Sequence, residues 1–186
     1  KLLVVACNSA AAAALDTLRE QLDIPVIGVI EPGLRAAARV TRTGRIGVIG
    51  TVGTIASGAY QRLAGELALE DGEVVLTCAA CPGFVEFVEA GDVESDQVHV
   101  LAERLLAPVR AATVDTLVLG CTHYPLLART IGDVMGRGVV LVSSADETAF
   151  AVRDLLTGRG MLAAGPPSDP RHIFFTSGCV DTFRTL

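Results

Sequence analysis

The chain has 186 residues, of which 51% are apolar, and its formal net charge is −6. This length and composition allow one large or two small globular domains and exclude a disordered chain. The positive charges are scattered singly, which argues against a nucleic-acid surface, and no apolar run approaches the roughly 20 residues that span a bilayer.

Short β-rich runs alternate with segments rich in Ala, Leu and Arg. We predict strands at 2–6, 26–30, 45–50, 74–78, 116–120, 139–143 and 172–176. We predict helices near 9–22, 32–42, 54–69, 96–112, 125–135 and 145–157. The Pro- and Gly-containing stretch 163–170 predicts a loop. This alternation predicts an α/β fold with mainly parallel, buried strands and right-handed crossovers.

The cysteines and the lysine restrict the chemistry. The odd count of five cysteines, the large core and the lack of a signal peptide favour a reducing cytosol and free thiols. Lys1 is the only lysine, so no residue is suited to a pyridoxal Schiff base, and we expect no cofactor. The chain enters a core-strand pattern directly after Lys1, and we therefore expect a segment upstream of it.

Two stretches share one plan. VVACNSA (4–10) and VLGCTHY (118–124) each contain a buried strand, a small residue, a cysteine, a polar residue and then a helix. Ligands of open α/β sheets bind at the carboxyl ends of strands. A helix N-terminus also favours a thiolate and offers free N–H groups to an anion. Both positions therefore suit a thiolate that works beside a bound carboxylate.

The simpler interpretations remain open at this point. A single strand-end cysteine is more often a core residue than a catalytic one, but the matched pair Cys7 and Cys121 favours chemistry. His123, two residues after Cys121, is a candidate general acid/base. Cys78 and Cys81 form a C-x-x-C that could join these residues in a zinc site, but the usual second pair of thiols is absent.

The threonines and glutamates near these motifs also allow two interpretations. Thr51 and Thr54 follow a predicted strand, where they either cap a helix or recognise a carboxylate. Glu86 and Glu89 lie among apolar residues in CPGFVEFVEAGD (81–92). Glutamates are usually solvated, although a carboxylate near a histidine could tune it.

With these motifs in view, the chain resembles the glutamate racemases of the cofactor-independent aspartate/glutamate racemase superfamily. VVACNSA resembles that family's A-C-N-[TS]-A motif, and LVLGCTHYPLL resembles G-C-T-H-[YF]-P. CPGFVEFVEAG resembles C-P-x-F-V-x-x-V-E, and VIGTVGTIASGAY resembles the G-T-x-x-T segment. The similarity runs through essentially the whole chain, and the paired cysteine motifs are its specific part.

The resemblance implies roles for named residues. Cys7 and Cys121 would be the two catalytic acid/bases, with His123 as the partner of Cys121 and Glu89 as a supporting carboxylate. The residues that would contact substrate or stand beside it are Asn8, Ser9, Thr51, Thr54, Thr122 and His123. No metal is implied.

The resemblance also implies an architecture. It predicts two pseudo-symmetric lobes with mainly parallel sheets flanked by helices, and an active site in the cleft between them. Residues 27–140 would form one lobe, and residues 1–26 and 141–186 would belong to the other. The family's D-S-G-x-G-G motif and P-Y-G loop are not found in these residues, and its C-terminal helix is cut short after Leu186, so we expect an incomplete site.

The implied activity is interconversion of L- and D-glutamate in the cytoplasm, which supplies D-glutamate for peptidoglycan. Aspartate or hydantoin racemisation, or a non-catalytic binding protein on this scaffold, are the alternatives. We expect glutamate as the small-molecule partner and neither membrane nor direct nucleic-acid binding. A homodimer and a protein partner such as DNA gyrase are weaker expectations.

Overall fold

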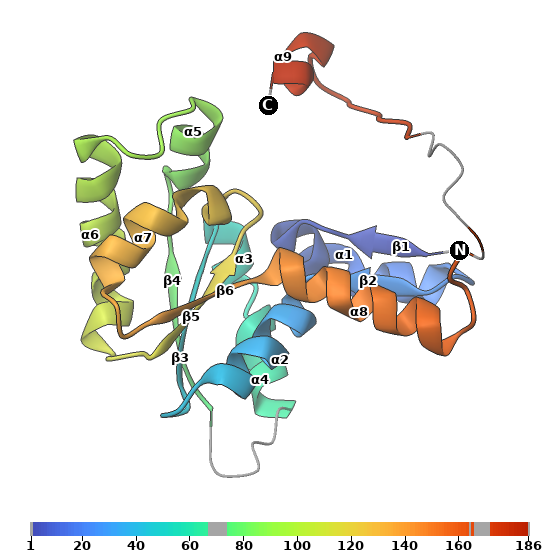
Figure 1. Cartoon of the computed structure of the whole chain (residues 1–186), viewed down its shortest axis with the longest axis horizontal. Coiled ribbons are helices and arrows are strands. Elements are labelled where there is room, and N and C mark those ends of the chain that lie inside the picture. Colours follow the sequence, from blue (N-terminus) through green and yellow to red (C-terminus); the bar gives the residue numbers. More distant parts are fainter. Residues whose placement is uncertain (1, 67–73, 164, 166–171, 186) are drawn as a thin grey trace.

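The computed structural model describes residues 2–66, 74–163, 165 and 172–185. Two parallel sheets organise these residues (Figure 1): β1 pairs with β2, and the larger sheet has the strand order β4-β3-β5-β6. The strands are β1 Leu3–Val5, β2 Val26–Gly28, β3 Arg45–Gly50, β4 Val75–Ala80, β5 Thr116–Gly120 and β6 Val140–Ser143.

Helices connect and flank the strands. They are α1 Asn8–Gln21, α2 Ile30–Val40, α3 Val52–Ala56, α4 Ala59–Glu66, α5 Phe84–Glu89, α6 Asp96–Ala111, the 3-10 helix η1 Tyr124–Leu127, α7 Ala128–Met135, α8 Ser144–Gly158 and α9 Val180–Thr185. The predicted α/β class, with parallel sheets flanked by helices, is confirmed.

The larger sheet is covered on both faces. Successive residues of β5 alternate, so that Leu117 and Leu119 pack among α5, α6 and α7. Val118 packs on the other face, with Leu34 of α2 and Tyr60 of α4. Because all five residues of β5 are buried, the strand reads as a continuous apolar run in the sequence.

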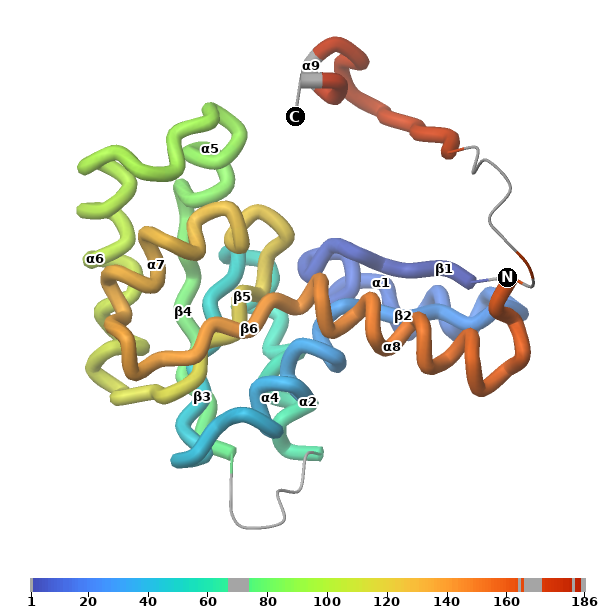
Figure 2. The backbone as a smooth tube through the Cα atoms, in the orientation of Figure 1, coloured from blue at the N-terminus to red at the C-terminus, as the bar shows by residue number. Residues whose placement is uncertain are grey.

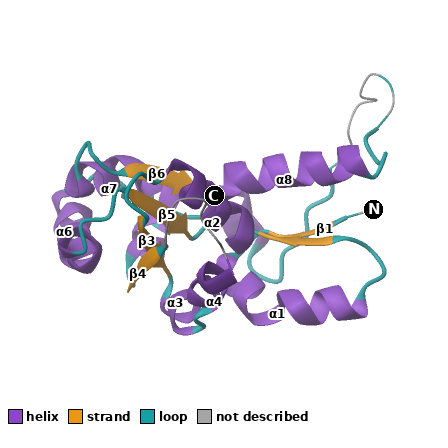
Figure 3. Ribbon diagram, turned by 90° about the horizontal axis from the view of Figure 1, so that it is seen from below, coloured by secondary structure: helices purple, strands orange, loops and turns teal. Residues whose placement is uncertain are grey.

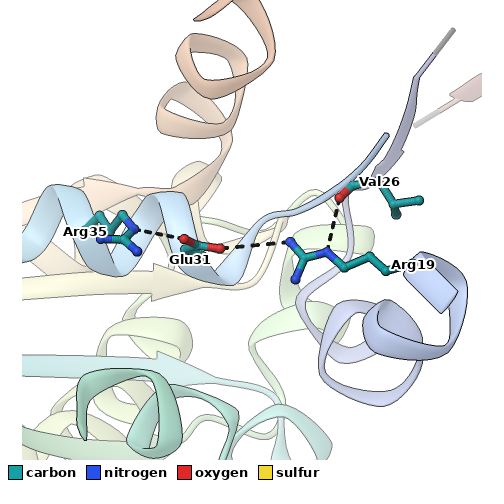
Figure 4. A network of polar contacts seen from close by, with 4 residues as sticks. All are labelled: Arg19, Val26, Glu31 and Arg35. Atoms are coloured by element: carbon teal, nitrogen blue, oxygen red, sulfur yellow. Dashed lines mark hydrogen bonds and ion pairs between the residues drawn. The ribbon is translucent and has the colours of Figure 1, made fainter. Parts of the chain in front are cut away.

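The smaller sheet lies between α1 and α8 (Figure 3). Arg19 of α1 donates a hydrogen bond to the carbonyl oxygen of Val26 at 3.3 Å and lies 3.9 Å from Glu31, which also pairs with Arg35 at 2.9 Å (Figure 4). This network links α1, β2 and α2. Its side chains are exposed, so each ion pair contributes little stability on its own.

Helix α8 joins the two sheets. It follows β6 directly and packs on both α2 and β2. Gly33 of α2 makes this approach possible, because a Cβ there would lie 2.9 Å from the Cβ of Ser144. The smaller sheet is therefore held against the larger one by close helix packing.

Two predicted helices differ from the structure. The helix predicted at 54–69 is two helices, α3 and α4, separated at Gly58, whose φ of +69° favours glycine; residues 67–69 lie outside the described residues. The helix predicted at 125–135 begins as η1. The short helices α5 and α9 were not predicted. Most of the loop predicted at 163–170 lies outside the described residues.

The strand predicted at 172–176 is wrong. Among the described residues they have no ladder partner, and the side chains of Ile173, Phe174 and Phe175 are exposed. They lead into α9, which lies apart from the two sheets (Figure 2). An apolar β-branched run forms a strand only where a neighbouring strand accepts its backbone hydrogen bonds, and none does so here.

No helix in the part of the chain that the structure describes is long and apolar enough to cross a membrane. The predicted division into lobes at residues 26 and 140 stays a prediction. β6, which begins at the second boundary, pairs with β5 in the larger sheet.

Candidate active site

Cys7 lies between the smaller sheet and α1. It is the N-cap residue of α1, with backbone angles of φ −97° and ψ 126°, and its side chain makes no capping hydrogen bond. The residue is exposed. The first N–H groups of a helix have no partner within the helix, so they can bind an anion beside this thiol.

Cys121 directly follows β5 and is only 7% exposed. The preceding residue, Gly120, has no room for a side chain. A Cβ there would lie 2.7 Å from the carbonyl oxygen of Ile49 and 3.1 Å from the hydroxyl oxygen of Tyr60. Close strand packing therefore requires glycine immediately before this thiol.

A histidine and a carboxylate extend from the Cys121 thiol. The sulfur lies 3.8 Å from Nδ1 of His123, and Nε2 of His123 lies 3.3 Å from Oε1 of Glu89, the last residue of α5. A carboxylate at Nε2 favours the neutral tautomer with its proton there, which leaves the Nδ1 lone pair for the thiol. The oxygen of Thr122 lies 3.4 Å from the same Nδ1.

Burial raises the pKa of the Cys121 thiol above its usual value. The backbone N–H of His123 opposes this shift, while a charged Cys7 would increase it through repulsion. The N–H groups at this turn lower the pKa of Cys121 as expected, but loss of solvation outweighs them and the net direction is upward.

Three hydroxyls connect α1 with the start of α3. The Ser9 oxygen lies 2.8 Å from that of Thr51 and 2.9 Å from that of Thr54, and the two threonine oxygens are 3.0 Å apart. Thr51 also caps α3 by accepting from the backbone N–H of Thr54. Thr51 therefore caps α3 and also belongs to the hydroxyl cluster. The three hydroxyls can together donate to a carboxylate.

Asn8 has a partner that sequence reasoning missed. The Tyr60 hydroxyl donates to Asn8 Oδ1 at 2.8 Å, and Asn8 is only 2% exposed. Tyr60 occurs in the motif that carries the two threonines, but a buried tyrosine signals only that its hydroxyl needs a partner. The identity of that partner, 52 residues away, is a property of the fold.

The remaining thiol pair lies in the core. Burial raises the pKa of Cys78 to about 11 and that of Cys81 to about 12. Over the described ranges, no group of three or more His, Cys, Asp or Glu side chains could hold a metal ion. Nothing here therefore supports the zinc alternative.

Two surface cavities lie away from the candidate site. One of about 490 Å³ lies along α5 and α6, and one of about 310 Å³ lies among α1, β2, α2 and α8. Neither is lined by any of the nine predicted site residues. The site is therefore defined by its polar contacts and strand ends.

Comparison with known proteins gives consistent matches. A family model described as Asp/Glu/Hydantoin racemase matches residues 1–152. A glutamate racemase from Acidothermus cellulolyticus is 49% identical over the whole chain, which spans 69% of that relative. A relative from Geobacter metallireducens, also a glutamate racemase, is 51% identical over 174 residues, 94% of this chain and 63% of its own length.

Solved structures agree. The crystal structure of the glutamate racemase isoform RacE1 from Bacillus anthracis has a TM-score of 0.92 and 46% identity, and it is covered to 68% by the whole of this chain. The Francisella tularensis glutamate racemase in complex with D-glutamate has a TM-score of 0.88 and 28% identity, with 67% of it covered. The chain thus spans about two thirds of the length of these relatives.

Proposed function

This chain belongs to the Asp/Glu/hydantoin racemase family, and we propose that it is a glutamate racemase in which one thiolate takes the α-proton and a second thiol returns a proton to the opposite face. One observation carries this proposal: Cys7 and Cys121 follow the carboxyl ends of parallel strands in two different sheets, and each precedes or begins a helical turn. A two-base racemisation places an acid/base on each face of the α-carbon, and two separate strand ends can supply them.

The proton balance requires opposite protonation states. One thiolate removes the α-proton as the other thiol delivers its proton to the opposite face, so the two sulfurs exchange states. Burial raises the pKa of Cys121, so this thiol is harder to ionise than a solvated one. His123 can accept its proton at Nδ1, while Glu89 stabilises the resulting imidazolium through Nε2.

The substrate carboxylates have candidate donors on α1 and at the start of α3. The hydroxyls of Ser9, Thr51 and Thr54 form one group of donors, and the first N–H groups of α1 form another. Asn8 and Thr122 stand directly beside the two cysteines in the sequence. The hydroxyls and the N–H groups of α1, fixed before substrate arrives, stabilise the charge that develops on the α-carboxylate in the transition state.

The test is a substrate comparison. The full-length protein that carries this sequence is incubated with L-glutamate, L-aspartate or an L-hydantoin, and circular dichroism follows loss of optical activity. Glutamate is expected to be the preferred substrate. Preference for aspartate or hydantoin would overturn the glutamate assignment, and no racemisation of any of the three would favour a binding protein on this scaffold.

A second arm addresses the chemistry. Racemisation is expected to survive dialysis against chelator and treatment with carbonyl reagents, since thiols carry the protons. Recovery of a lost activity on adding zinc or pyridoxal phosphate would contradict this expectation. The cytoplasmic location, the homodimer, the DNA gyrase partner and the lobe boundaries at 26 and 140 stay predictions that rest on the family resemblance.

A further inference from the structure

Tyr60 connects the two parts of the candidate site. It lies on α4, which packs on the larger sheet, and it is 1% exposed. Its hydroxyl reaches across to α1 and donates to Oδ1 of Asn8 at 2.8 Å. Figure 3 shows α1 next to α3 and α4 at this junction.

The carboxamide of Asn8 has a hydrogen-bond partner for its oxygen and none for its nitrogen among the described residues. Oδ1 accepts from Tyr60, whereas Nδ2 is buried and has no hydrogen-bond partner among the described residues. A buried donor without a partner is costly and uncommon. Because the carboxamide is planar, a partner that holds Oδ1 also fixes where Nδ2 points. Asn8 directly follows Cys7 in the sequence and lies in the first turn of α1.

The Tyr60 hydroxyl also lies against the other cysteine motif. A Cβ at Gly120 would come within 3.1 Å of it, and Gly120 precedes Cys121. Burial, with the nearby thiols of Cys78 and Cys121, raises the pKa of Tyr60 well above its usual value. The hydroxyl therefore keeps its proton and remains a donor across the working pH range.

We propose that Tyr60 is a positioning residue: by donating to Oδ1 of Asn8, it turns Nδ2 toward the substrate, where this amide donates to a carboxylate oxygen. The inference rests on the proposed function, because it names an amino acid substrate. It requires no movement of Tyr60, whose ring is fixed in the core. The Tyr60 hydroxyl does not contact the substrate, but it determines that Nδ2 of Asn8, rather than Oδ1, faces the substrate.

Tyr60→Phe tests the inference with little change in shape. Loss of one neutral hydrogen bond should raise the KM for L-glutamate about tenfold. The kcat value should stay within about twofold, since the carboxylate contact exists in both ground and transition states. Asn8→Ala should raise KM further, by about 10- to 100-fold, because it removes a donor to a charged group.

The double variant separates positioning from general damage. If Tyr60 acts through Asn8, adding Tyr60→Phe to Asn8→Ala should leave KM unchanged within about twofold. Equal effects of Tyr60→Phe in both backgrounds would overturn the inference. Tyr124→Phe is the matched control, since Tyr124 is also fully buried and its hydroxyl binds the carbonyl of Cys81. It should lower the melting temperature similarly without changing KM.

The side-chain amide of Asn8 gives a readout that does not depend on turnover. Asn8 is the only asparagine in the sequence, so selective ¹⁵N labelling of asparagine amides gives a single pair of side-chain NMR signals from this chain. Tyr60→Phe should shift this pair in the free protein, whereas Tyr124→Phe should not. Titration with L-glutamate should move the pair in the wild type and move it less in Tyr60→Phe.

The outcomes are distinguishable. Absence of glutamate racemisation by the wild type would overturn the proposed function. An Asn8 signal that is the same in wild type and Tyr60→Phe would overturn the contact itself, whatever the activity. Racemisation with an Asn8 signal unmoved by glutamate would retain the function and overturn the role of Nδ2.

Discussion

Cys7 follows a three-residue strand of the smaller sheet and is exposed, whereas Cys121 follows a five-residue strand inside the larger sheet and is 7% exposed. The two sequence motifs look equivalent, but the two cysteines have different surroundings in the structure. Cys121 loses solvation and has a histidine and a carboxylate in line behind it. A matched motif therefore fixes the place of a thiol, while the fold around it fixes how easily that thiol ionises.

The largest expected effect comes from removing either thiol. Cys7→Ser and Cys121→Ser should each lower the racemisation rate by about 10²- to 10⁴-fold, because a hydroxyl is a much weaker base at neutral pH. Each variant should still exchange the α-proton of one enantiomer with heavy water, and by family analogy Cys7 serves D-glutamate and Cys121 serves L-glutamate. Proton NMR of the recovered amino acid measures this exchange.

Near wild-type racemisation by Cys121→Ser would show that Cys121 is only a core residue. The wild type in heavy water supplies the reference. Stopped early, it should yield deuterated product enantiomer and largely protiated substrate, because the acid thiol has exchanged with solvent. Extensive deuteration of recovered substrate would instead indicate one base that serves both faces.

Changing His123 should affect the two thiols unequally. His123→Gln should slow racemisation about 10- to 100-fold by removing the acceptor behind Cys121. The equilibrium constant of a racemisation is one, so kcat/KM must fall equally in both directions. The asymmetry should appear in the primary deuterium isotope effect on kcat/KM. This effect should rise for [2-²H]glutamate of the enantiomer that Cys121 deprotonates and not for its mirror image. Equal isotope effects would argue that His123 assists both thiols.

A smaller effect is expected at Glu89. Its carboxylate is about half exposed and 3.3 Å from His123, so solvent and salt screen the contact. Glu89→Gln should lower kcat about two- to fivefold, with the difference from wild type shrinking at high ionic strength. Glu86→Gln, on the same helix and exposed, is the control and should leave kcat unchanged. Matching losses in both variants would point to a general charge effect on α5.

The smallest effect tests whether burial raises the pKa of a core thiol, that of Cys81. The pKa of Cys81 is raised by burial from 9.0 to about 12, so its stabilising contribution is complete below pH 9 and is lost as pH rises toward 12. The free energy of unfolding should therefore fall by about 1 kcal/mol at pH 10 through this thiol. Urea unfolding at pH 7.5 and 10 measures this change. The fall should be smaller in Cys81→Ala, and an unchanged fall would assign the pH dependence to other groups.

The sequence was sufficient where burial on both faces determines the pattern. β3 and β5 are continuous apolar runs in the chain, and the structure buries them between helices. The paired thiols were predicted because both follow apolar runs that were expected to be buried strands. β5 is buried, but β1 is not, since Val4 is 38% exposed. The contact from Glu89 to His123 was reached only through the family resemblance, since it joins residues 34 apart whose spacing carries no local signal.

The failures share a cause. The segment 172–176 has the composition of a strand, but a strand also needs a neighbouring edge, and composition does not specify one. Tyr60 was quoted within a motif and given no role, because its partner is fixed by the meeting of α1 and α4. Helix α5 has only six residues, too few for a helical period to stand out.

The triangle of Ser9, Thr51 and Thr54 has a consequence for the site before substrate arrives. Each of its three contacts can run in either sense, so the hydroxyl protons can point around the ring clockwise or anticlockwise. In both arrangements every hydroxyl donates one hydrogen bond and accepts another. The empty site therefore has two equivalent proton arrangements and leaves none of the three hydroxyl donors without a partner. An arriving carboxylate removes this choice by turning protons outward, without any heavy atom having to move.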